Sequence, residues 1–212
     1  MIKQSRVFYS FILLVCKIVF KFFARLKVKI PKDLFLESPV ILAGNHASLV
    51  DPFVVSASFP FSCKIHPLHF ITSDYWMGVP VVGFLIGSLG AFPVYKKQGL
   101  EKSLKIPYQI LKEGNSLLIF PRGKMVKRFY KNKGKVGTAI LALNTGIPVI
   151  PIKISDSSPK SILKLLLMKR RIKVVVGQPI NLFERLGKAN DFTRNDISRA
   201  TEIIIEEIAR LS

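Results

Sequence analysis

Short apolar runs alternate with polar and turn-forming stretches along most of the chain after residue 38. Runs of this kind, rich in Val, Ile, Leu and Phe, are typical of buried strands. The predicted strands are Val40–Ala43, His66–Thr72, Gly90–Val94, Leu117–Phe120, Val149–Ile154 and Ile172–Val176. The predicted helices are Asp51–Ser58, Asp74–Leu89 with a break near Pro80, Leu100–Lys112, Val136–Asn144 and Asp196–Leu211. This alternation predicts an α/β fold, a single layered domain with a mixed sheet flanked by helices.

The N-terminal segment has a different pattern. It is mostly apolar from Val7 to Phe23, but Lys17 and Lys21 interrupt it, and its longest uncharged stretch, Val7–Cys16, is shorter than a bilayer-spanning helix needs. On a helix, most apolar residues face away from one polar stripe, formed by Lys3, Arg6, Ser10, Lys17, Lys21 and Arg25. We therefore expect residues 1–30 to form a helix that lies in the membrane interface, and residues 31–212 to form the globular domain. A tilted span with snorkelling lysines is the alternative.

Composition supports a membrane partner. The 212 residues carry a formal net charge of +20 although 49% of them are hydrophobic. Nucleic-acid binders are often this basic but seldom this apolar. Anionic membrane lipids attract Lys and Arg side chains near the surface, so a membrane-associated protein fits both properties.

Candidate chemistry begins directly after the first predicted strand. His46 and Asp51 stand five residues apart in the string Asn45-His46-Ala47-Ser48-Leu49-Val50-Asp51. A neutral imidazole can take a proton from a hydroxyl group near pH 7, and a carboxylate can fix its tautomer. The pair is a candidate catalytic site. Asp51, which precedes Pro52, could instead simply cap the next helix.

Three further blocks follow other apolar segments, namely Gly90–Lys96, Phe120–Lys124 and Ile147–Pro151. Together with the His46 block, in this order, they resemble the glycerolipid acyltransferase family, most closely the lysophosphatidic acid acyltransferases. The resemblance implies that His46 is the general base of a direct attack by an acceptor hydroxyl on an acyl thioester, with Asp51 orienting it. It also implies that Lys96, which stands where the family usually has Arg, binds the acceptor phosphate.

The third block departs from the family pattern of F-P-E-G followed by Thr or Ser and then Arg. Arg122 stands at the Glu position, Lys124 at the Thr/Ser position and Met125 at the Arg position, while Gly123 is retained for a tight turn. Arg122, Gly123 and Lys124 could form a rewired phosphate site. Alternatively, the site accepts another lysolipid or hydroxyl compound.

The basic stretch around Phe129 and Tyr130 could bind single-stranded RNA or lipid headgroups. The family resemblance and the N-terminal helix favour lipid, so no nucleic acid is expected. We expect an enzyme of phospholipid biosynthesis on the cytoplasmic face of the membrane, with anionic lipids, a lysophospholipid acceptor and acyl carrier protein or coenzyme A thioesters as partners. No metal-ligand cluster is visible, and no cofactor beyond the thioester donor is expected. A non-catalytic basic protein that binds membrane or RNA is the remaining alternative.

Overall fold

The computed structural model describes residues 6–34, 36–94, 99–125, 134–156 and 171–212, and all statements below concern these residues. The helices are α1 (Arg6–Phe22), α2 (Asp51–Ser58), α3 (Asp74–Gly78), α4 (Pro80–Ser88), α5 (Gly99–Lys112), α6 (Gly137–Thr145), α8 (Leu182–Leu186) and α9 (Arg194–Arg210). The strands are β1 (Lys27–Lys29), β2 (Ile41–Gly44), β3 (Leu68–Thr72), β4 (Ala91–Pro93), β5 (Ser116–Ile119), β6 (Val149–Ser155) and β7 (Lys173–Val176).

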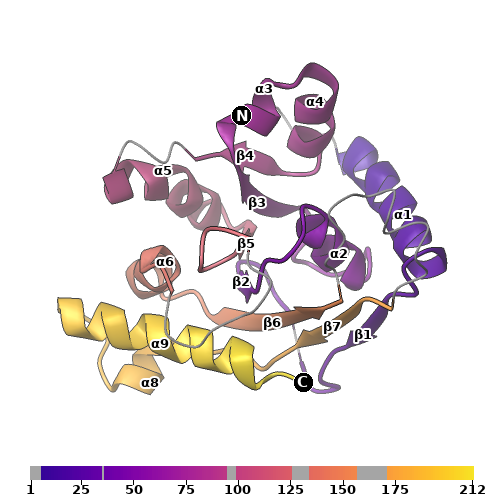
Figure 1. Ribbon diagram of the computed structural model, residues 1–212. Coiled ribbons are helices and arrows are strands. Elements are labelled where there is room, and N and C mark those ends of the chain that lie inside the picture. The colour runs from indigo at the N-terminus through magenta and orange to yellow at the C-terminus, as the bar shows by residue number, and fades with distance from the viewer. Residues whose placement is uncertain (1–5, 35, 95–98, 126–133, 157–170) are drawn as a thin grey trace.

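The seven described strands form one twisted sheet in the order β1-β7-β6-β2-β5-β3-β4 (Figure 1). Neighbouring strands are parallel except β6 and β7, which are antiparallel. The predicted α/β domain with a mixed sheet flanked by helices is therefore confirmed. Because β2, β5 and β6 are mutually parallel, their carboxyl ends meet at one edge of the sheet.

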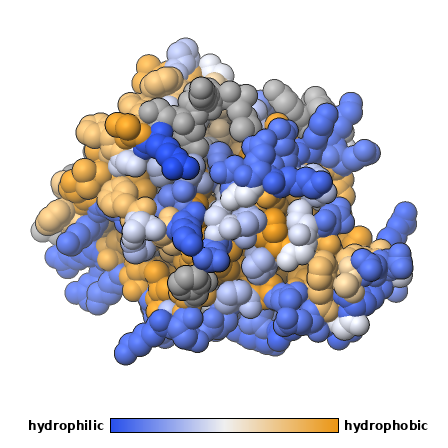
Figure 2. Space-filling view, turned by 180° about the vertical axis from the view of Figure 1, so that it is seen from behind, coloured by the Kyte–Doolittle hydropathy of each residue, from blue (hydrophilic) through white to orange (hydrophobic). Residues whose placement is uncertain are grey.

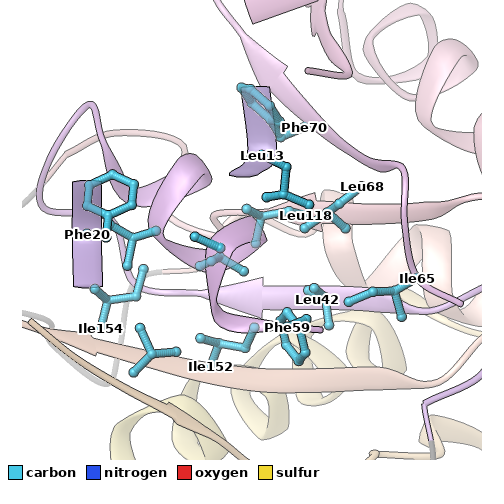
Figure 3. Packing of buried hydrophobic residues seen from close by; sticks show 14 of the residues in the cluster. Leu13, Phe20, Leu42, Phe59, Ile65, Leu68, Phe70, Leu118, Ile152 and Ile154 are labelled. Atoms are coloured by element: carbon cyan, nitrogen blue, oxygen red, sulfur yellow. The ribbon is translucent and has the colours of Figure 1, made fainter. Parts of the chain in front are cut away.

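Apolar residues cover both faces of the sheet because successive side chains of a strand point to opposite sides. Leu42 belongs to the core under α1 and α2, whereas its neighbours Ile41 and Ala43 belong to the core under α5, α6 and α9. Figure 3 shows the first of these cores, where Leu42 and Leu118 of the sheet lie among side chains from the helical layer. This double coverage explains why the central strands are continuous apolar runs without polar alternation.

Helix α1 packs against α2 and helps to build the first core. Tyr9, Leu13 and Phe20 are buried there. The side chain of Lys17 was expected to face lipid headgroups, but it turns inward and its Nζ donates hydrogen bonds to the carbonyl oxygens of Ala57, at 3.0 Å, and Phe59. These carbonyls lie at the C-terminal end of α2, where a cation is favourable. The prediction that Lys17 belongs to an outward-facing polar stripe is therefore wrong.

Two short elements were not predicted. β1 consists of three exposed residues that pair with β7. α8 is preceded by its N-cap residue Asn181, whose side chain accepts a hydrogen bond from Phe183 N. Both α1 and β1 contact the rest of the fold, and the proposed boundary at residue 30 stays a prediction. Among the described helices, none is both long and apolar enough to cross a bilayer.

Candidate active site

His46 lies just beyond the carboxyl end of β2. The amide side chain of Asn45 bonds the backbone of Ile154 twice: Asn45 Nδ2 donates to Ile154 O at 2.8 Å and Ile154 N donates to Asn45 Oδ1 at 2.7 Å. Asn45 thereby continues the attachment of β2 to β6 after the strand has ended. The chain is fixed up to the residue before His46, so the imidazole projects from a rigid base.

Asp51, the first residue of α2, is fully buried. Its Oδ2 accepts three hydrogen bonds, from His46 Nδ1 at 2.9 Å, Ala47 N at 2.7 Å and Ser48 N at 2.8 Å. The N–H groups of Ala47 and Ser48 that bond Asp51 lie before the helix, and the side chain of the N-cap residue, Val50, makes no capping hydrogen bond. Asp51 therefore holds the loop that carries His46 and does not act as the helix cap considered from the sequence.

The imidazole of His46 is held on a second side by Phe120, the residue after β5. The two rings stack with centroids 4.1 Å apart and an interplanar angle of 11°. With Nδ1–H donating to the Asp51 carboxylate, Nε2 is the nitrogen that can accept a proton. The side chain of His46 is 18% exposed, so it is fixed yet accessible. Such an arrangement can act as a general base toward a bound hydroxyl group.

A basic turn follows Phe120 at the same edge of the sheet. Gly123 has φ +62°, which glycine adopts without strain, and its N–H donates to Phe120 O at 2.8 Å. Lys135 returns to this turn: its backbone N donates to Pro121 O at 2.7 Å, and its side chain lies across Gly123, where an added Cβ would be 3.0 Å from Nζ. Three cationic residues therefore lie close together: Arg122 and Lys124 in the turn, and Lys135, which packs against it. The sequence has no acidic residue between Glu113 and Asp156 to offset them.

The structure brings together most of the predicted site. His46 bonds Asp51, and Phe120 connects this pair to the turn with Arg122, Gly123 and Lys124. Lys96 lies outside the described residues. The contributions of Asn45, Phe120 and Lys135 were not predicted individually. The first two stand inside the recognised blocks, while only the basic run pointed to Lys135.

The other two histidines are structural. The Nδ1 of His66 is 2.8 Å from the hydroxyl of Tyr9, which also accepts a hydrogen bond from Leu68 N. Burial lowers the pKa of His66 to about 4 and raises the pKa of Tyr9 to about 12. Burial also lowers the pKa of His69. Both imidazoles are therefore held neutral within the fold, and in the described part of the chain neither is hydrogen-bonded to a carboxylate as His46 is.

Residues 25–155 match the protein-family model described as Acyltransferase. The chain is 28% identical over 157 residues to a probable 1-acyl-sn-glycerol-3-phosphate acyltransferase of Mycoplasma pneumoniae, covering 67% of this chain and 57% of that protein. It is 24% identical over 175 residues to the 1-acyl-sn-glycerol-3-phosphate acyltransferase of Bacillus subtilis, covering 82% of each. It is 25% identical over 176 residues to a chloroplastic 1-acyl-sn-glycerol-3-phosphate acyltransferase of Brassica napus, covering 79% of this chain. The chain spans about half of that relative's length, 48%.

The fold is also similar to a solved structure. The crystal structure of a 1-acyl-sn-glycerophosphate acyltransferase from Thermotoga maritima aligns with a TM-score of 0.64 and 17% sequence identity. The alignment covers 95% of this chain and 81% of that chain. The overall arrangement of sheet and helices is therefore shared.

Proposed function

The chain belongs to the acyltransferase family, and from this we propose that it transfers a fatty acyl group from an acyl thioester to lysophosphatidic acid, giving phosphatidic acid in phospholipid biosynthesis. The observation that carries the proposal is the hydrogen-bonded pair of His46 and Asp51, next to a basic turn. A base for a hydroxyl group and cations for a phosphate are the two things this acceptor requires.

In the proposed mechanism, Nε2 of His46 takes the proton of the acceptor hydroxyl as its oxygen attacks the thioester carbonyl carbon. The new C–O bond forms, the C–S bond breaks, and the imidazolium returns the proton to the leaving thiolate. Asp51 holds the reactive tautomer and stabilises the transient imidazolium through the 2.9 Å hydrogen bond. The acceptor attacks directly, so no acyl-enzyme is formed. Acyl carrier protein and coenzyme A are both candidate donors, since the net charge of +20 attracts an acidic carrier or phosphates.

Phe120 is a positioning residue in this mechanism. Its stacking limits rotation of the His46 ring, and its face favours the imidazolium by a cation–π interaction. We expect Phe120→Leu to lower kcat by roughly 3- to 10-fold with little change in KM, because about 1 kcal/mol of such stabilisation is lost. Steady-state kinetics would measure this, and Phe120→Tyr, which keeps the aromatic face, should restore most of the rate. An unchanged kcat in the leucine variant would contradict the role.

The acceptor phosphate is proposed to bind the cations of the turn, Arg122, Lys124 and Lys135. Met125 cannot provide the charge of the family's usual Arg, and Lys135 offers a replacement from a different part of the chain. The exposed apolar residues on α1 support association with a membrane, and we propose that this is the cytoplasmic face with its anionic lipids. Because the turn lacks the family's usual Glu and Arg, transfer to another lysolipid or to an alcohol without a terminal phosphate is the second candidate.

The test compares transfer to lysophosphatidic acid and to a monoacylglycerol of the same chain length, with both thioester donors. We expect transfer to lysophosphatidic acid, and a KM for it about tenfold higher in Lys135→Ala, because one charge-assisted hydrogen bond is lost. The rate with monoacylglycerol should not respond to this substitution. Lys173→Ala, at an exposed position on β7, is the matched control and should behave like the wild type. Transfer to monoacylglycerol alone would establish the second candidate instead.

A further inference from the structure

The outward side of α1 is mostly apolar. Besides the buried residues that attach it to the core, α1 exposes large hydrophobic side chains at helical spacing: Val7 at 81%, Phe11 at 61%, Leu14 at 45%, Val15 at 44%, Ile18 at 48% and Phe22 at 69%. Burying such side chains in an apolar medium is favourable by roughly 25 cal/mol for each Å² removed from water. The structure provides no covering element for them among the described residues.

A second exposed apolar surface belongs to the hairpin of α3 and α4, which connects β3 to β4. Tyr75 is 69% exposed, Val81 72%, Phe84 55% and Leu85 41%. These side chains are therefore exposed to solvent. The hairpin is tightly packed in itself, because a Cβ on Gly83 would lie 2.3 Å from Met77 O.

The two surfaces are continuous. Phe8 of α1 and Phe84 of α4 contact each other, with ring centroids 5.6 Å apart. In Figure 2, hydrophobic residues gather along the upper left of the molecule, where the rear view places α1 and the α3–α4 hairpin of Figure 1. An apolar patch contributed by three helices exceeds the scattered hydrophobic residues that any protein surface carries.

Charge distinguishes among the partners that could cover this patch. No acidic residue occurs in the sequence before Asp33, and Arg6, Lys21 and Arg25 are exposed on or beside α1. The cations of α1 would repel those of a second copy, while the α3–α4 hairpin carries a single charged residue, the exposed Asp74 at its start. A bilayer with anionic headgroups can bury the apolar side chains in its acyl region and pair the cations with its headgroups.

We propose that the α3–α4 hairpin is a second membrane-docking element, which enters the interface of an anionic bilayer beside α1. The inference rests on the proposed function only in taking a lipid bilayer as the partner, and it does not depend on catalysis. Two elements that contact each other fix the orientation of the domain on the membrane, whereas a single helix leaves the domain free to rotate about the helix axis.

The chain contains a single tryptophan, Trp76, and it lies in α3 beside Tyr75 with ring centroids 5.2 Å apart. Its fluorescence therefore reports on the hairpin without any label. With vesicles of phosphatidylglycerol and phosphatidylcholine, we expect the emission to shift to shorter wavelength and to be quenched by lipids brominated on their acyl chains. Binding of the protein to vesicles without either change would overturn the proposal and leave α1 as the only docking element.

Variants give an independent readout. The double substitution Val81→Ser and Phe84→Ser should weaken vesicle co-sedimentation by tenfold or more, because both side chains are exposed and would lose burial in lipid. Leu100→Ser, at a 48% exposed position on α5, is the matched control and should bind as the wild type does. Equal binding by the double variant would contradict the inference. So would concentration-dependent self-association without vesicle binding, which would assign the patch to a second copy.

The outcome is separable from the proposed function. Transfer to a short-chain acceptor dissolved as monomers needs no bilayer, so the double variant should retain it. Loss of vesicle binding with retained soluble transfer is the expected pattern. Vesicle binding through the hairpin in a protein that transfers no acyl group would support the inference while contradicting the proposed function.

Discussion

Replacing His46 with alanine is expected to lower kcat for transfer to lysophosphatidic acid by about 10³-fold, since general base catalysis is typically worth 10²- to 10⁴-fold. Nε2 is the nitrogen of this ring that is left to take the proton, because Nδ1 bonds Asp51 at 2.9 Å. Phe120, which stacks on the imidazole, has no basic atom that could replace it. KM should change little, because the proposed phosphate contacts lie on the turn after Phe120. Steady-state kinetics on the purified variant measures both constants.

Stability and membrane binding distinguish this result from unfolding. The His46 side chain is partly exposed and is held by Phe120 and Asp51, so the melting temperature should fall only slightly. Binding to anionic vesicles should be retained. His66→Gln is the matched control: it removes another imidazole, one that bonds Tyr9 in the interior, and should cost stability while leaving kcat per folded molecule unchanged. A His46→Ala protein with kcat within tenfold of the wild type would exclude His46 as the base.

The strands and helices could largely be predicted from the sequence because both faces of the sheet are covered, which makes the central strands into continuous apolar runs. The helix Asp51–Ser58 was predicted with the bounds that the structure gives it. β1 could not be found in this way. Its three residues, Lys27–Lys29, are all exposed, and only the pairing with β7 makes them a strand.

In the candidate site, too, contacts between residues close in sequence could be predicted, whereas contacts between distant segments could not. His46 and Asp51 could be paired from sequence because only the four loop residues 47–50 lie between them. Phe120 meets His46 only because β5 lies beside β2 in the sheet, and Lys135 reaches Gly123 from twelve residues further along the chain. Contacts of this kind depend on strand order, which the apolar pattern does not specify.

Helix α1 illustrates a limit of periodicity. Its sequence pattern separates polar from apolar positions but does not say which apolar residues meet protein and which meet lipid. The structure divides them: Tyr9, Leu13 and Phe20 pack on the domain, while Phe11, Ile18 and their neighbours remain exposed. Lys17 shows that even a charged position can be recruited to the protein side when unpaired carbonyls lie within its reach.

Asp51→Asn is expected to lower kcat by roughly 10³-fold, nearly as much as loss of the imidazole itself. The carboxylate Oδ2 accepts hydrogen bonds from His46 Nδ1, Ala47 N and Ser48 N. An amide oxygen in the place of Oδ2 can keep these three bonds, but it carries no full negative charge, so the imidazolium that forms when Nε2 takes a proton is no longer stabilised. The NH₂ group takes the place of Oδ1, which is buried and has no hydrogen-bond partner among the described residues.

The same substitution should reduce the free energy of unfolding by about 1–3 kcal/mol, because bonds to a buried charged acceptor become bonds to a neutral one. Chemical denaturation measures the free energy of unfolding and the folded fraction, and kcat is then expressed per folded molecule. The double variant His46→Ala with Asp51→Asn should be hardly slower than either single variant, since both substitutions disable one unit. If Asp51 only holds the loop, the outcome differs: stability would fall, kcat per folded molecule would stay close to the wild type, and the two substitutions would affect the rate independently.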